Sequence, residues 1–401
     1  MSTRALVQAM LAPPALTEGE RKLKARLYQL EKKRELLGVL RLEPEALALA
    51  DKLRDGDPET TGWILNLLGL SHYHTGSNAR ACELHEQHRA ICEAQGDHAG
   101  VAAACGNLGC CYHSTGDYGR ARELHEQQRA ICEALGNRAG VAAACGNLGN
   151  CYKSTGDYAR ARELHEQRRA MAEALGDRAG VAKASGSLAR CCVNTGEYAR
   201  AISHFSAQYD MAKELQVVIC QADAALGMGV ALRLLVRVSV RGRAAGAFES
   251  PGSHLSTSAC GDDRVQEAGR WLEIAVDLGH AVARLHLACL AFDAGDEQTA
   301  LAHLQDYLSS CVGVARNHCE GCNQTRGEDA HMLTCAGCRV ARFCSAEHQK
   351  MASRDVSRGG SLLYVRHKHV CGLLGTWRQR VVKDGSPPNA LRAELLSFLR
   401  Q

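Results

Sequence analysis

Four closely spaced pairs of cysteine and histidine residues lie near the C-terminal end of this 401-residue chain. Thiolate and imidazole are the ligands that Zn²⁺ prefers, and structural zinc sites use four of them. Eight ligands fill two tetrahedral sites, which leaves no position for a water molecule or a substrate. The sequence therefore predicts a structural zinc module that binds two Zn²⁺ ions per chain. The predicted ligands are Cys319, Cys322, Cys335, Cys338, Cys344, His348, His367 and Cys371.

The sequence before these ligands repeats with a period of 40 residues. Residues 99–138 and 139–178 share 33 identities in 40 positions, and the same frame extends back to about residue 59 and forward to about 218. Within one period, apolar or small residues recur at helical spacing from Val141 to Ser154 and again from Tyr158 to Leu175. Such a period predicts an all-α solenoid of helix–turn–helix units.

The composition of the chain changes along its length and predicts four regions. The insert in the second region is rich in Gly, Ser and Ala and has no helical period, so we expect a loop there. The expected regions are a helical cap over 1–56, with helices at about 18–38 and 43–54, a solenoid over 57–310 with the insert at about 239–263, the zinc module over 316–372, and a tail over 373–401 with a short helix.

The repeat carries a recognisable motif at its turn. Leu148-Gly149-x2-Tyr152, followed by Gly156-Asp157-Tyr158-x2-Ala161, resembles the tetratricopeptide repeat (TPR) in the 40-residue variant of the Pins-type cell-polarity adaptors. The resemblance implies that the first helix of each unit lines a concave face, where amides bind the backbone of an extended partner peptide and cations hold its acidic side chains. The predicted peptide-binding residues are Asn107, Asn147, Asn150, Lys153, Ser187, Arg190 and Asn194.

Histidines and cysteines also recur inside the repeats. His85, His125 and His165 are spaced by 40 residues, and that spacing is explained by the repeat itself. We expect these histidines to be packing or surface residues and not metal ligands. The repeated cysteines, such as Cys105 and Cys145, are expected to be small packing residues between helices.

The C-terminal ligands belong to a second motif. The string CRVARFCSAEHQK and the closing His367-Lys368-x2-Cys371 resemble the MYND-type zinc finger. The resemblance implies interleaved sites, in which Cys319, Cys322, Cys344 and His348 hold one zinc ion, and Cys335, Cys338, His367 and Cys371 hold the other. A RING-type finger would need a Cys-x-His pair in the middle, which this sequence does not have.

Two features of the finger depart from the family pattern. Eighteen residues separate His348 from His367, so His369 is an alternative to His367 as a ligand. Ser353 stands where the family usually has an aromatic residue that contacts Pro-x-Leu-x-Pro peptides. Whether this finger binds proline-rich peptides therefore stays open.

The net charge, the apolar pattern and the cysteine content indicate which partners and which cellular compartment to expect. The formal net charge of +4 is weak, and the basic residues lack interleaved aromatics, so we do not expect nucleic acid binding. The sequence shows no signal-peptide pattern and no long uninterrupted apolar run, so we expect no membrane span. Twenty cysteines without a secretory pattern indicate a reducing compartment, and we expect an intracellular protein, cytoplasmic rather than nuclear.

These patterns together predict a non-enzymatic adaptor that binds protein or peptide partners. A transcriptional co-regulator that acts through the finger is an alternative. A protein lysine methyltransferase is a third reading, but it would need a SET domain, and no run of strand patterns or nucleophile–base set is apparent. The identity of the partners and the oligomeric state cannot be inferred from the sequence.

Overall fold

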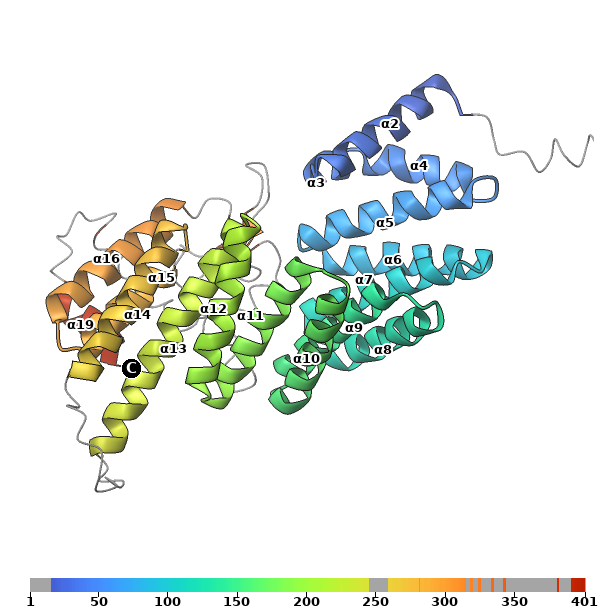
Figure 1. Ribbon diagram of the computed structural model, residues 1–401. Coiled ribbons are helices and arrows are strands. Elements are labelled where there is room, and N and C mark those ends of the chain that lie inside the picture. The colour runs from blue at the N-terminus through green and yellow to red at the C-terminus, as the bar shows by residue number, and fades with distance from the viewer. Residues whose placement is uncertain are drawn as a thin grey trace, which may run out of the picture. The chain divides into compact units, whose positions relative to one another are not determined.

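The computed structural model of the chain is a helical solenoid (Figure 1). It describes the backbone of residues 16–244, 259–280, 282–314 and 391–400, residue 381, and four two-residue strands. Side chains are described over 16–239, 263–280, 282–309, 381 and 391–399. Two compact units meet between Cys151 and Tyr152, inside one helix.

Eight helices of similar length form the regular part of the chain. Their apolar stripes recur with the 40-residue period, and within each unit successive helices pack against one another, as α5 to α8 and α10 to α12 do. The first helices of the pairs are α5 (Pro58–His74), α7 (His98–Thr115), α9 (Arg138–Ser154) and α11 (Arg178–Thr195). The second helices are α6 (Asn78–Gln95), α8 (Tyr118–Ala134), α10 (Tyr158–Ala174) and α12 (Tyr198–Glu214). The solenoid of helix–turn–helix units expected from the sequence is thus confirmed for these residues.

The turns between the helices use glycine and aspartate at fixed places. Gly156 has a φ of 87° and Gly176 a φ of 68°, in the left-handed region that a side chain disfavours. Asp177 then caps α11, because its Oδ1 accepts a hydrogen bond of 2.8 Å from the Gly180 N–H. The repeated Gly-Asp dipeptide therefore ends one helix and begins the next.

The N-terminal cap consists of α2 (Glu18–Lys32), α3 (Leu36–Leu40) and α4 (Glu43–Leu53). Thr17 and Glu20 form a capping box at the start of α2. The stretch expected as one helix over 18–38 is two helices, because Arg34 adopts a left-handed φ of 56° between them. Apolar residues of all three cap helices, with Val39 from α3, share one hydrophobic cluster with α5 and α6.

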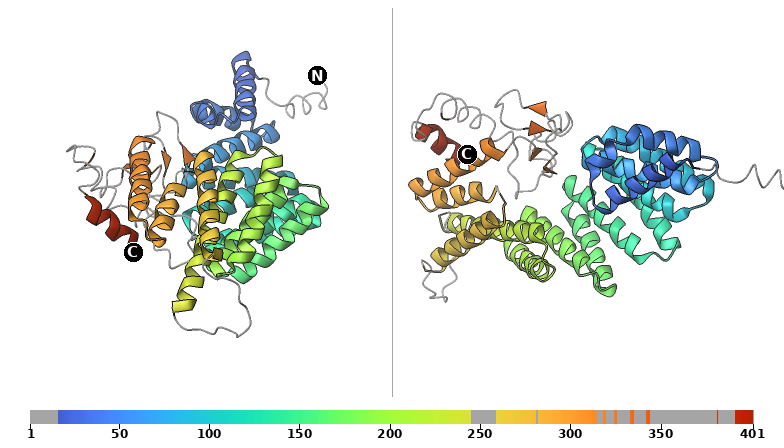
Figure 2. Two further views of the ribbon diagram at one scale, coloured as in Figure 1. Left: turned by 60° about the vertical axis from the view of Figure 1, so that its left-hand side comes forward. Right: turned by 90° about the horizontal axis from the view of Figure 1, so that it is seen from above.

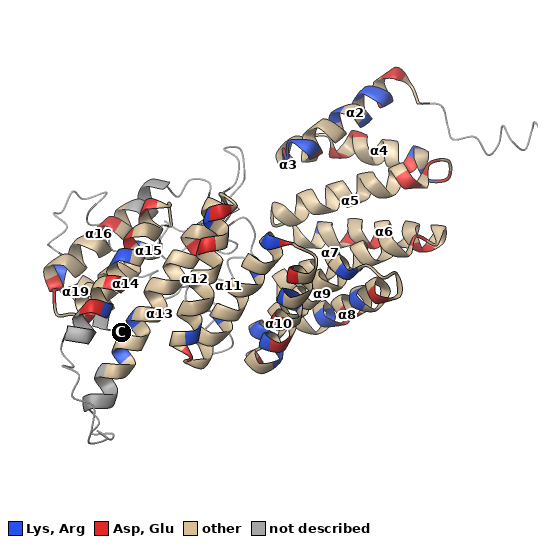
Figure 3. Cartoon of the chain, in the orientation of Figure 1, with Lys and Arg blue, Asp and Glu red and all other residues tan. Residues whose placement is uncertain are grey.

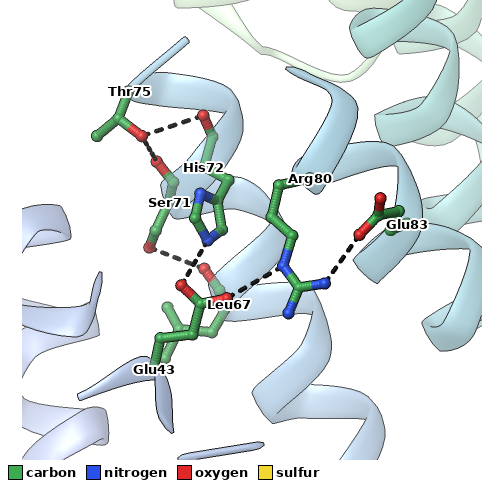
Figure 4. Close-up of polar contacts among 7 residues, drawn as sticks. All are labelled: Glu43, Leu67, Ser71, His72, Thr75, Arg80 and Glu83. Atoms are coloured by element: carbon green, nitrogen blue, oxygen red, sulfur yellow. Dashed lines mark hydrogen bonds and ion pairs between the residues drawn. The ribbon is translucent and has the colours of Figure 1, made fainter. Parts of the chain in front are cut away.

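A polar contact also joins the cap to the first repeat (Figure 4). Glu43, at the start of α4, receives hydrogen bonds from His72 Nε2 of α5 (2.8 Å) and Arg80 Nε of α6 (3.1 Å). Arg80 also donates to Glu83 within α6 at 2.8 Å. One carboxylate thus ties three helices together.

Beyond the regular repeats the helices become unequal in length. They are α13 (Val218–Ala244), α14 (Ala259–Asp277), α15 (Val282–Asp293), α16 (Glu297–Val314) and α19 (Arg392–Arg400). α13 packs between α12 and α14, α15 packs against α14 and α16, and α19 lies against α16 (Figure 2). The helices α13 and α14 extend into the ends of the range 239–263, where the sequence predicts a loop.

Val218–Ser239 in α13 is long and apolar enough to cross a membrane by length and composition, and it is the one such stretch in the described part of the chain. Of its most apolar window, 56 % is buried by the rest of the protein. Figure 3 shows α13 with few charged residues, and the helix has packed neighbours on two sides. A core helix has the same composition, so this stretch is explained by packing between α12 and α14.

The four strands form two hairpin-like pairs. β1 (His318–Cys319) pairs antiparallel with β2 (Gln324–Thr325), and β3 (Leu333–Thr334) pairs antiparallel with β4 (Arg342–Phe343). β1 also lies next to β4. In the sequence, one predicted ligand pair falls between the strands of each hairpin or at their ends.

Candidate functional site

In the first unit, a polar stripe runs along the first helices of two successive repeats. Asn107 of α7 is half-buried and donates its Nδ2–H to Asn66 Oδ1 of α5 at 2.9 Å. One helical heptad further on, Ser114 Oγ lies 3.4 Å from the Tyr73 hydroxyl. The stripe therefore lies across α5 and α7, on the face where the sequence predicts peptide contacts.

Asn147 and Asn150 continue the predicted set on α9. Asn147 is the counterpart of Asn107 one repeat later, and both α9 amides are half-buried. No hydrogen-bond partner for either amide is found among the described residues. A half-buried amide carries donors and an acceptor that an extended peptide backbone can satisfy.

In the second unit, the predicted residues of α11 bind partly to their own helix. Ser187 is 4 % exposed and donates its hydroxyl to the Lys183 carbonyl at 3.1 Å. Asn194 Nδ2 donates to the Arg190 carbonyl at 2.7 Å, and an Arg190 Nη2–H points to Ser187 Oγ at 3.5 Å. The side chains of Ser187 and Asn194 thus bond within α11, next to Arg190.

Lys153, at the end of α9, lies close to this surface and has an unusual pKa. Burial and, to a smaller extent, the neighbouring cationic Arg190 lower the pKa of its ammonium group to about 8. Neither Lys153 nor Arg190 has a carboxylate partner within the described residues. By contrast Arg162, also in the second unit, contacts Glu197 at 2.7 Å. Lys153 and Arg190 are therefore two neighbouring cations for which the described residues of this unit supply no ion-pair partner.

Two buried titratable groups near this cation pair carry no negative charge at neutral pH. Burial raises the pKa of the Cys191 thiol to about 11, so the thiol is neutral. Burial, together with Lys153 and other cations, lowers the pKa of His165 to about 3, so that imidazole is also neutral. Neither of these two groups offsets the charge of Lys153 and Arg190.

One further cation was missed by the sequence reasoning. Lys183 is exposed on α11, two helical turns before Arg190, and the two share one face of the helix. Both cations act against the rise that burial causes in the pKa of the Cys220 thiol of α13, so both lie near that helix. Asn66 was missed as well. The 40-residue frame places its neighbour Leu67, and not Asn66, opposite Asn107, so the repeat pattern gave no signal for it.

The repeated histidines are packing residues. His85, His125 and His165 are at most 1 % exposed, and burial lowers the pKa values of the first two to about 4. The His85 and His125 rings lie on Gly69 and Gly109 of the preceding helices, where an added Cβ would be within 2.6 Å of the ring. No groups that could hold a metal ion, and no disulfides, occur among the described residues.

The predicted zinc ligands fall mostly beyond the part of the chain that can be described. Cys319 is the last residue of strand β1, of which only the backbone is described. Cys322, Cys335, Cys338, Cys344, His348, His367 and Cys371 lie outside the described residues, as does the alternative ligand His369. The zinc module stays a prediction from the sequence.

A cleft of about 780 Å³ lies between α2 and the start of α5. Lys24 Nζ donates to Thr60 Oγ1 at 2.7 Å inside it, and the Trp63 indole N–H donates to Glu31 at 3.0 Å. Several polar groups of the cleft therefore already satisfy one another.

Comparison with known proteins identifies the repeat. A family model described as tetratricopeptide repeat matches residues 60–134, 111–174 and 140–214. Residues 60–214 are tetratricopeptide repeats. A search of curated proteins found no match.

Two solved structures are among those similar to this chain. A Signal Transduction ATPase with Numerous Domains (STAND) protein with a tetratricopeptide repeat sensor, from Pyrococcus horikoshii, is 13 % identical with a TM-score of 0.52, over 72 % of this chain and 43 % of its own. This chain thus matches less than half of the length of that protein. BtubC (BKLC) from P. vanneervenii is 18 % identical with a TM-score of 0.44, over 56 % of this chain and 95 % of its own.

Proposed function

We propose that this protein is a non-enzymatic adaptor whose TPR solenoid binds an acidic segment of a partner protein. Tetratricopeptide repeats form a scaffold for protein–protein interaction, and residues 60–214 carry them. The observation that supports an acidic partner is the neighbouring pair Lys153 and Arg190, which lacks a carboxylate partner in the described part of its unit. An acidic side chain placed between two such cations would form charge-assisted hydrogen bonds with both.

The rest of the predicted set fits the same role. Asn147 and Asn150 offer unsatisfied amides on α9, and Asn107 and Asn66 form an amide pair on the neighbouring first helices. Peptide main chain needs both donors and acceptors, and amides supply them together. Ser187 and Asn194 position the α11 surface around Arg190.

A selection from random dodecapeptides displayed on phage tests the proposed acidic specificity. The intact protein should enrich peptides with Asp and Glu, and Lys153→Gln/Arg190→Gln should lose that enrichment. Lys213→Gln, which removes an exposed lysine of the second helix α12, is the matched control and should keep it. Enrichment that lacks acidic residues, or that survives the double substitution, would contradict the proposal.

The pKa of Lys153 gives a second readout with an enriched peptide. Its ammonium group loses its proton as pH rises through about 8, whereas Arg190 stays charged. Affinity for the acidic peptide should therefore fall by about tenfold between pH 7 and pH 9.5, since one charge-assisted bond is lost. Lys153→Arg should bind with an affinity that does not change over this range, as measured by fluorescence anisotropy.

We further propose that the C-terminal module is a two-zinc finger of the MYND type and provides a second contact surface. This rests on the eight ligands and their spacing, with two zinc ions expected per chain. Elemental analysis should find about two zinc per chain, and about one in Cys335→Ser. Loss of zinc in His367→Ala but not in His369→Ala would assign the last histidine ligand, and intact protein with one zinc would contradict the two-site arrangement.

A further inference from the structure

Two cysteine thiols meet where α6 packs against α7. Cys82, the fifth residue of α6, is half-buried, and Cys111, near the end of α7, is 0 % exposed. The Cys111 thiol is hydrogen-bonded to the Cys82 thiol, so the two sulfur atoms are in contact across the helix pair. Both residues belong to the first unit.

The other repeats show that this contact is a departure from the repeated pattern. One repeat later the counterparts of Cys82 and Cys111 are Arg122 and Cys151, and two repeats later they are Arg162 and Cys191. The charges of Arg122 and Arg162 act on the thiols of Cys151 and Cys191, so in these repeats the facing residue is an arginine. The first repeat thus has a second thiol where its neighbours have a guanidinium group.

We propose that Cys82 and Cys111 form an oxidative modification site, at which a hydroperoxide converts the two thiols into a disulfide between α6 and α7. In the first step the Cys82 sulfur attacks the peroxide, the O–O bond breaks, and Cys82 becomes a sulfenic acid with release of water or an alcohol. In the second step the Cys111 thiol attacks the sulfenic acid, the S–O bond breaks, and water leaves with the Cys111 proton. Sulfur is oxidised and the peroxide is reduced.

Exposure assigns the order of the two steps. Cys82 is the more exposed of the two residues and is reached by peroxide first, whereas Cys111 is buried beside it and resolves the sulfenic acid. The hydrogen bond to Cys82, followed by burial, raises the pKa of the Cys111 thiol. Because the reacting species is the thiolate, the disulfide should form slowly at neutral pH and faster as pH rises.

Tryptic digestion of the full chain after treatment with hydrogen peroxide gives a direct test. Peptide 81–89 carries Cys82 and no other cysteine, whereas peptide 90–120 carries Cys111 together with three other cysteines, which are Cys92, Cys105 and Cys110. Mass spectrometry without reduction should find these two peptides linked, in an amount that increases with pH and disappears after treatment with dithiothreitol.

Matched variants separate this site from other cysteine chemistry. Cys110→Ser should keep the link, and Cys111→Ser should remove it. Cys82→Arg, which restores the residue of the later repeats, should also remove it while the protein keeps its helical circular-dichroism spectrum. A link that persists in Cys111→Ser, or a peroxide-treated protein in which Cys82 carries only sulfinic acid or remains reduced, would overturn the proposal.

Discussion

Two turns of the second unit, one repeat apart, have the same backbone path but different side chains. Leu175-Gly176-Asp177 connects α10 to α11, and Leu215-Gln216-Val217 connects α12 to α13. The middle residue has a φ of 68° in the first turn and 55° in the second, where glutamine replaces glycine. This conformation is strained for glutamine, and valine has no oxygen with which to cap a helix. The second turn therefore forms although its residues favour neither the left-handed φ nor a helix cap.

The residues after these turns differ as well. Arg178 follows the first turn and forms an ion pair with Glu214. Val218 and Ile219 follow the second turn and are 51 % and 77 % exposed. α13 must then be held by its packing, in which the Phe205 ring of α12 lies on Gly227. The regular repeats combine local signals with packing, whereas their continuation lacks these local signals and is held by contacts with other helices, such as the Phe205 ring and the hydrogen bond from Gln221 to the Ala212 carbonyl.

The largest effect is expected where the packing of α13 is disturbed. A Cβ at residue 227 would lie 2.4 Å from the Phe205 ring, so Gly227→Ala should lower the free energy of unfolding by about 2–3 kcal/mol. In Gly119→Ala of α8 the nearest atom outside the helix backbone is 3.6 Å away, and that change should stay within about 1 kcal/mol. Urea unfolding followed by circular dichroism measures both. Equal midpoints would mean that packing on Phe205 does not hold α13.

A second expected effect is on the pH dependence of stability, which is set by the residue buried on the second helix of each repeat. The first three repeats bury His85, His125 and His165, and the fourth has Phe205 at that position. The folded-state pKa of His165 is lowered to about 3 from an ordinary value of 6.5, so below pH 6.5 the unfolded chain binds a proton that the folded chain does not. Stability is then lost as pH falls from 6.5 toward 3, by about 1.4 kcal/mol per pH unit for this histidine.

His165→Phe, which adopts the residue of the following repeat, should therefore flatten the dependence of stability on pH between 6 and 4. Urea midpoints measured at several pH values give this slope, and the slope does not depend on any packing change that is the same at every pH. His204→Phe on α12 is the control, because the pKa of this half-buried imidazole is lowered without full burial. An identical slope in His165→Phe and the parent protein would show that the buried histidine is not the acid-sensitive group.

The smallest effect is expected at the turns themselves. Val217→Asp would supply the cap that Asp177 provides one repeat earlier and should raise stability by about 1 kcal/mol. Asp177→Ala should lower stability by a similar amount. Thermal unfolding should show opposite changes of similar size for the two variants. A destabilising Val217→Asp would show that the missing cap is not what distinguishes the second turn.

The sequence predicted the repeat because its signals are local and periodic. Helix pairs, glycine turns and aspartate caps recur every 40 residues from residue 59 onward, and the helices follow them. The division of the cap at Arg34 was not predicted, since no glycine or proline marks it. The balance of charge around Lys153 also could not be predicted, because it depends on which carboxylates reach Arg190 and Arg162 from neighbouring helices. Ion pairs between side chains of different helices leave no periodic pattern in the sequence.

The contact of Glu43 with His72 and Arg80 has a consequence for assembly. Stacked units of nearly identical sequence present ends that fit their own neighbours, so an open end can accept a second molecule and grow into a fibre. His72 distinguishes the first repeat, since its counterparts 40 and 80 residues later are Tyr112 and Tyr152. The cap thus recognises one repeat among similar ones, and by covering its surface it closes this end of the array to head-to-tail polymerisation.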